Sequence, residues 1–114
     1  MTLTAGEKIH VITRRLFEND LRRHFIGEVE ACTDILIRAR GFAFVYDEGS
    51  NDFTRREETR TRIFSLLDAN LIVNVLPKDV AVEDIRYRLD DRNRRLVTDG
   101  KGFAMNISEF GAQR

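Results

Sequence analysis

The chain contains few of the residues that mark secreted or membrane-spanning proteins. It has one cysteine, Cys32, one proline, Pro77, and no tryptophan. A single cysteine cannot form an intramolecular disulfide, so nothing indicates an oxidising compartment. The N-terminus lacks the apolar core of a signal peptide. The longest apolar run, residues 71–76, is too short to span a bilayer. We therefore expect a cytoplasmic protein with no membrane partner.

The chain also lacks net charge, because its 19 basic and 19 acidic residues balance. Binding to phosphate backbones is driven by accumulated positive charge, so this balance argues against a generic polyanion binder. An apolar fraction of 42% with no net charge is typical of a folded chain rather than a disordered one. The length, 114 residues, predicts a single domain over residues 1–114.

The common signatures of enzymes and metal sites are missing. There is no nucleophile elbow, no zinc-type His-Glu-x-x-His and no pair of cysteines at metal-ligand spacing. The three classical metal ligands, His10, His24 and Cys32, have no short-range spacing that supports a site, so we predict no metal and no cofactor. The Asp99-Gly100-Lys101-Gly102 segment lacks a following helix, and we interpret it as a hairpin turn rather than a phosphate loop.

What the sequence does contain is a series of short alternating segments separated by turn formers, a pattern typical of β-strands. Gly27 and Gly41 interrupt two of these segments and predict bends. The pattern favours an all-β fold: a small barrel-like domain with a C-terminal β-meander over residues 85–107 and at most one short helix. The expected strands cover residues 9–17 (before turn formers at 18–20), 25–31, 35–46, 63–67, 71–76, 84–89, 94–98 and 103–107. Strand, turn and strand are preferred to a helix over residues 60–71.

One face of the long segment 35–46 combines positive charge with aromatic rings. Its members are Arg38, Arg40, Phe42, Phe44 and Tyr46. Arginines for the backbone and rings for the bases are the combination that single-stranded nucleic-acid binders use. The alternative interpretation is that the rings belong to the core and the arginines pair with Glu28 and Glu30 on the preceding strand.

Two segments resemble the Sm-like small barrels. Phe25-Ile26-Gly27-Glu28-Val29 followed by Asp34-Ile35-Leu36-Ile37 is similar to the first motif of that family, and Leu71 to Pro77 is similar to its closing strand. The resemblance covers residues 9–77 and implies a bent five-stranded barrel that assembles into a homo-oligomer. The RNA-contacting asparagine of the family has no counterpart after Asp34, where Leu36 and Ile37 stand.

Three hypotheses about function follow. The first is a non-enzymatic binding or assembly module that forms a homo-oligomer through exposed strand edges. The second is a single-stranded RNA-binding module that uses the Arg38–Tyr46 face. The third is a small-ligand-binding protein or enzyme with a pocket, in which Asp34, Glu28 and His24 supply acid and base groups. The sequence favours the first and identifies no catalytic residue.

Overall fold

The computed structural model describes residues 2–15, 17 and 22–108, in two compact units of residues 1–78 and 79–114. All-β structure is confirmed for the described residues, whose only helix is one 3₁₀ turn. The predicted turn at 18–20 lies outside the described residues. No described helix is long and apolar enough to cross a membrane. The elements are β1 (Lys8–Thr13), β2 (Arg23–Cys32), β3 (Leu36–Asp47), β4 (Asp52–Arg55), β5 (Arg60–Ser65), β6 (Leu71–Leu76), η1 (Val82–Asp84), β7 (Arg86–Leu89), β8 (Arg95–Thr98) and β9 (Ala104–Asn106).

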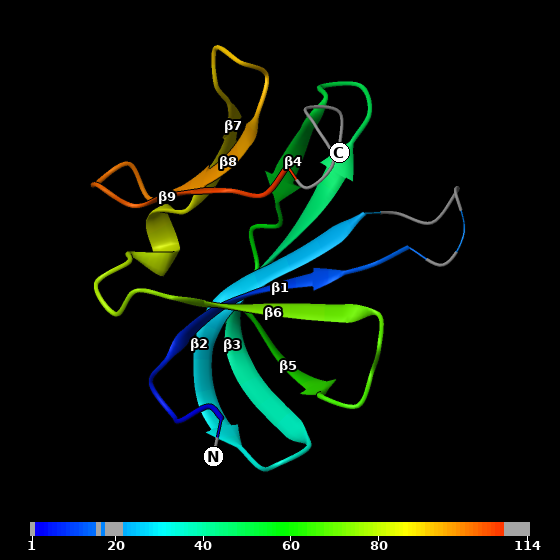
Figure 1. Cartoon of the computed structure of the whole chain (residues 1–114), viewed down its shortest axis with the longest axis vertical. Helices are drawn as coiled ribbons and strands as arrows, with labels where there is room; N and C mark the ends of the chain where they lie inside the picture. The colour runs from blue at the N-terminus through cyan, green and yellow to red at the C-terminus, as the bar shows by residue number, and fades with distance from the viewer. Residues whose placement is uncertain (1, 16, 18–21, 109–114) are drawn as a thin grey trace. The chain divides into compact units, whose positions relative to one another are not determined.

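Unit 1 holds one antiparallel sheet in the order β4-β3-β2-β1-β6, with β5 also paired to β3. The long strand β3 is shared between two partners. Its first half pairs with β5, from Leu36 opposite Ser65 to Gly41 opposite Arg60. Its last residues pair with β4, as Figure 1 shows. The predicted long strand is therefore confirmed, and so is the preference for strand, turn and strand over a helix at residues 60–71.

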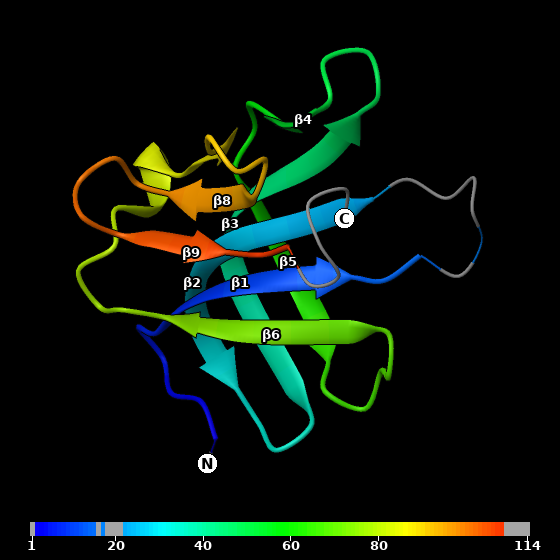
Figure 2. The ribbon, with the colours of Figure 1, turned by 45° about the horizontal axis from the view of Figure 1, so that its top comes forward.

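The sheet of unit 1 does not close into a barrel. Among the described residues, β6 pairs only with β1 and β5 pairs only with β3, so no ladder joins the two edges. The short connection between them is a tight turn, in which the Leu71 and Asp68 amides donate to the carbonyls of Asp68 and Ser65. Figure 2 shows β6, β1 and β2 side by side. The closed barrel expected from the strand pattern is thus absent, because the turn connects β5 and β6 without hydrogen-bonding them.

The main apolar cluster of unit 1 lies on one face of this sheet. Alternation places every second side chain of each strand on that face. Its buried members are Leu3, Ile9, Val11, Phe25, Val29, Ile37 and Ala39, with Cys32, Phe64, Leu71 and Val73 packed against them. The core members of β2 and β3, which include residues 25, 29, 37 and 39, follow this two-residue period.

Two glycines face each other where β2 and β3 run together, Gly27 opposite Gly41. A Cβ atom at Gly41 would collide with the backbone of Ile26 and Gly27, and one at Gly27 would collide with the Arg40 carbonyl. Only hydrogen at these positions lets the two backbones approach. Figure 1 shows β2 and β3 as curved strands.

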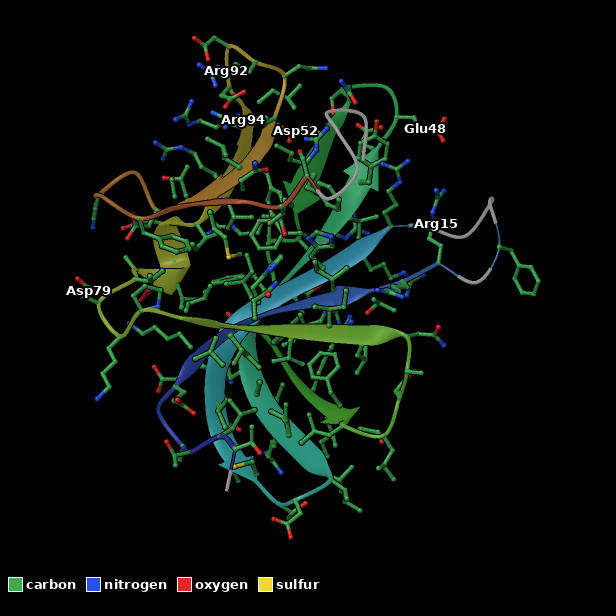
Figure 3. The ribbon with its side chains drawn as sticks, in the orientation of Figure 1. Arg15, Glu48, Asp52, Asp79, Arg92 and Arg94 are labelled. Atoms are coloured by element: carbon green, nitrogen blue, oxygen red, sulfur yellow. The ribbon has the colours of Figure 1, made fainter. Side chains whose placement is uncertain are left out.

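Unit 2 is the predicted three-stranded meander, in the order β7-β8-β9. The segment expected to start β7 at residue 84 instead ends the 3₁₀ turn, and the strand begins at Arg86. The Asp90 carboxylate holds the β7–β8 turn, because it accepts hydrogen bonds from the Arg92 and Arg94 amides and from Arg94 Nε. Figure 3 shows Arg92 and Arg94 at this turn. The Asp99-Gly100 turn then joins β8 to β9, with Gly100 at a φ of 74°.

Candidate functional site

A pocket lies in unit 1 where the edge partner of β3 changes. Residues 42 and 43 fall between the part of β3 that pairs with β5 and the part that pairs with β4. One bond bridges this gap, from the Arg56 amide to the Ala43 carbonyl at 2.9 Å. The connection of residues 56–59 runs between the two short strands here. The break in pairing therefore opens the edge of the sheet beside the middle of β3.

The pocket has a volume of about 350 Å³ and is lined largely by arginine. This volume is at the lower end of the range for small-ligand sites. Four arginines reach it from three segments: one from β2, two from β5 and one from the connection before β5. The complete lining is Arg23, His24, Ala43, Phe44, Val45, Arg56, Arg60 and Arg62.

Strand register explains why these arginines converge. Arg23 stands opposite Val45, Arg60 opposite Gly41 and Arg62 opposite Ala39. Directly opposed residues of paired strands share a face, so all three arginines lie on the face that carries the core. The Arg62 guanidinium lies over the Phe25 ring, 5.9 Å from its centre. The arginines therefore line one end of the core-bearing face.

The charge of the pocket is poorly balanced. Burial is the main cause that lowers the pKa of Arg62, and the neighbouring cations Arg60 and Arg23 lower it further. Arg60 pairs with Glu58 at 3.7 Å, but that carboxylate side chain is 81% exposed, so the pair is screened by water. Within the described part of the chain, Arg23, Arg56 and Arg62 make no ion pair with a carboxylate.

This arrangement suits an anion. An arginine keeps its proton at neutral pH and presents donors in a planar fork that matches the oxygens of phosphate or carboxylate. Like charges that crowd one pocket repel each other, and an anion that enters between them relieves the repulsion. Among the described lining residues, the four arginines give the pocket the donors that bind anions.

The five residues predicted for nucleic-acid binding occupy the opposite face of β3, and the structure gives them different environments. The Arg38 side chain pairs with Glu30 at 3.1 Å, as the alternative interpretation expects. Arg40 is exposed and stands opposite Glu28 without a described ion pair. Of the two predicted arginines on this face, Arg38 therefore has a described carboxylate partner and Arg40 does not.

The aromatic residues of that face are mostly occupied by neighbours within unit 1. Phe44 is buried, with 2% of its surface exposed. The Arg55 guanidinium covers the Phe42 ring at 4.7 Å, and that of Arg22 covers the Tyr46 ring at 4.8 Å. The Tyr46 hydroxyl also donates to Asn51 at 2.6 Å. A base could not stack on the arginine-covered face of either ring without displacing the guanidinium.

The two histidines, separated by 14 positions, meet in the structure. His10 Nε2 lies 3.0 Å from His24 Nδ1, and His10 Nδ1 lies 3.1 Å from the Asn74 amide. Cys32 is not part of this group, since its thiol donates to the Leu3 carbonyl. Among the described residues, no group of three or more His, Cys, Asp or Glu side chains is placed to hold a metal ion.

The acid–base groups named for an enzyme are not brought together. Glu28 lies four residues from His24 along β2, a separation of about 13 Å in an extended strand. His24 is buried on that strand, whereas Glu28 is exposed. Asp34 is exposed in the turn between β2 and β3. We assign no catalytic role to these residues.

Sequence reasoning missed all four pocket arginines. The usable signal was the spacing of Arg60 and Arg62, which share a strand face in the same way as Arg38 and Arg40. The contributions of Arg23 and Arg56 could not be seen in the same way, because they come from other segments. Comparisons with protein families, with curated proteins and with solved structures find no match for this chain.

Proposed function

We propose that unit 1 is a non-enzymatic binding module for a small anionic ligand that carries phosphate groups. The observation that supports this function is the convergence of Arg23, Arg56, Arg60 and Arg62 on one pocket. Among the described residues, the exposed Glu58 is the one carboxylate that pairs with any of them. A ligand with two or more negative charges engages several guanidinium groups at once, and each charge-assisted hydrogen bond is stronger than a neutral one.

We also propose that the sheet of unit 1 is an open variant of the Sm- or SH3-like small barrel. The order β6-β1-β2-β3-β5 supports this assignment, since it is an antiparallel sheet whose two edge strands follow each other in the chain. The pocket then lies at one end of the curled sheet, beside the break between β4 and β5. The mouths and ends of such sheets are common places for ligands.

The test is calorimetric titration of the full chain with inorganic pyrophosphate and with ATP. We expect binding that weakens as salt increases, because the attraction is largely electrostatic. The pocket variant is Arg60→Gln with Arg62→Gln, which removes two charges and keeps most of each side chain. It should bind at least about tenfold more weakly, a loss of roughly 1.4 kcal/mol.

A matched control comes from the same strand pair. Arg38→Gln with Arg40→Gln removes the same charge from the opposite face of β3, and it should leave pyrophosphate binding unchanged. Equal losses in both variants would mean that only overall charge matters and would refute the pocket. No heat of binding for either anion in low salt would refute the proposed function.

The nucleic-acid hypothesis for the Arg38–Tyr46 face is the second candidate, supported by the exposed Arg40 beside Phe42. A labelled oligouridylate separates it from the first candidate. If the oligonucleotide binds the wild-type chain and loses affinity in the Arg38/Arg40 variant but not in the Arg60/Arg62 variant, then the strand face is the ligand site.

A further inference from the structure

Strand β6 forms one edge of the sheet and differs in composition from the other edge. In the described residues it pairs with β1 and with no other strand. Its six residues, Leu-Ile-Val-Asn-Val-Leu, include no charge and no proline. Proteins usually protect such an edge with lysine, proline or a bulge, because unpaired backbone groups are a template for another strand. None of these protections is found within β6.

The register of β6 against β1 identifies the backbone groups that point away from the sheet. The Arg14 amide donates to the Asn70 carbonyl, so this pair lies at a hydrogen-bonded position of the ladder. Hydrogen-bonded and non-bonded positions alternate in an antiparallel pair. Ile72, Asn74 and Leu76 therefore direct their backbone groups to β1, and Leu71, Val73 and Val75 direct theirs outward.

We propose that β6 is a self-association edge, on which two copies of this chain pair their β6 strands antiparallel about a two-fold axis at Val73. This register places Val73 opposite its counterpart and Leu71 opposite Val75 of the other copy. All three outward residues then exchange both backbone groups with a partner. Moving the axis to Asn74 would place Leu71 opposite Pro77, which has no amide hydrogen to donate.

The side chains of β6 are also compatible with β6 of a second copy as the partner strand. Val75 is 54% exposed and would pack against Leu71 of the second copy, on the face that carries the core. No like charges meet, because β6 carries none. Self-pairing of the other edge would oppose arginines, since Arg55, Arg60 and Arg62 stand on β4 and β5. Like charges directly opposite each other destabilise a strand pair, so a second copy fits β6 and not β4 or β5.

The first experiment measures the mass of the full chain by light scattering over a range of concentrations. We expect a concentration-dependent dimer. Val75→Lys should raise the dimer dissociation constant at least about tenfold, because the ammonium would be buried against Leu71 without a counter-charge. Val75→Thr keeps the backbone and the shape and should still dimerise.

The second control places the same charge on the other edge. Ile63 is 63% exposed on β5, and Ile63→Lys should leave the dimer intact. A wild-type chain that stays monomeric at millimolar concentration would overturn the proposal. So would a dimer that Ile63→Lys dissociates and Val75→Lys does not.

Amide hydrogen exchange tests the register without any substitution. On dilution of the wild-type chain, exchange at Leu71, Val73 and Val75 should become faster, because their amides lose the second strand. Exchange at Ile72, Asn74 and Leu76 should change much less, since those amides bond to β1 within one copy. A dimer in which the two sets respond equally would show that another surface joins the copies.

Discussion

The buried histidine His10 makes the stability of this protein depend on pH in a window that begins well above the pKa of ordinary carboxylates. It is fully buried, and burial lowers its pKa from 6.5 to about 4. The contact with Asn74 acts in the same direction. The Asn74 amide nitrogen faces His10 Nδ1, so that ring nitrogen accepts a bond and Nε2 donates to His24. A His10 cation would place a second N–H against the donating amide.

The sign of the effect follows from the lowered pKa. Between pH 6.5 and pH 4, His10 is mostly protonated in the unfolded chain and mostly neutral in the folded chain. Lowering the pH in this range therefore favours unfolding. The contribution is fully present above the unfolded pKa of 6.5 and is lost as the pH falls toward 4. With about 1.4 kcal/mol for each pKa unit, lowering the pH from 7 to 5 should reduce the free energy of unfolding by about 2 kcal/mol.

The assay is urea unfolding followed by far-ultraviolet circular dichroism, at half-unit steps from pH 7.5 to 5. His10→Gln is the control, because the amide keeps a polar group near Nε2 and cannot titrate. The wild-type chain should lose about 2 kcal/mol more than the variant over this range. Parallel pH profiles for the two proteins would refute the reasoning, since His24 is present in both.

Two further substitutions test the fold. Gly41→Ala should lower the free energy of unfolding in urea by at least about 2 kcal/mol, because the added methyl meets the backbone of Ile26 and Gly27. The control, Gly49→Ala in an exposed turn, should change it by less than about 0.5 kcal/mol. Equal effects of the two substitutions would contradict the close approach of β2 and β3. Asp99→Asn should lower the unfolding temperature, because the buried carboxylate accepts bonds from the amides of Ala81, Lys101 and Phe103, and an amide side chain offers a single acceptor oxygen. These bonds, first of all the one from Lys101, lower the pKa of Asp99, so its contribution is present above the ordinary carboxylate range and lost in stronger acid. A variant that melts like the wild type at both pH 7 and pH 3 would count against this role.

Local patterns were enough to predict most of the described strands, but β4 (Asp52–Arg55) was not predicted, and β1 ends at Thr13 rather than at residue 17. A two-residue alternation of apolar and polar side chains expresses burial on one face, and both the long strand at residues 36–47 and the meander of β7, β8 and β9 follow it. Turn chemistry is equally local, as Asp99-Gly100 shows. The start of β7 was placed too early, because Asp84 and Ile85 continue the alternation although the backbone first makes a 3₁₀ turn.

Strand pairing determines features of the fold that the two-residue alternation does not encode. Whether the sheet closes depends on the geometry of the 66–70 turn, and no residue pattern in β5 or β6 predicts that geometry. The two interpretations of the β3 face also differed only in contacts, such as Arg38 with Glu30 and Arg55 with Phe42. Those contacts arise from the strand register, which joins residues that are distant in the chain.

The sequence by itself determined the β class, the positions of most strands and which side chains share a strand face, because each follows from a period of two along the backbone. Only the tertiary structure decided that Arg23 and Arg56 join Arg60 and Arg62 around one pocket, and that His10 lies against His24. These groups come from separate strands and turns. Their meeting depends on the order of strands in the sheet and on the break between β4 and β5, which are long-range properties of the folded chain.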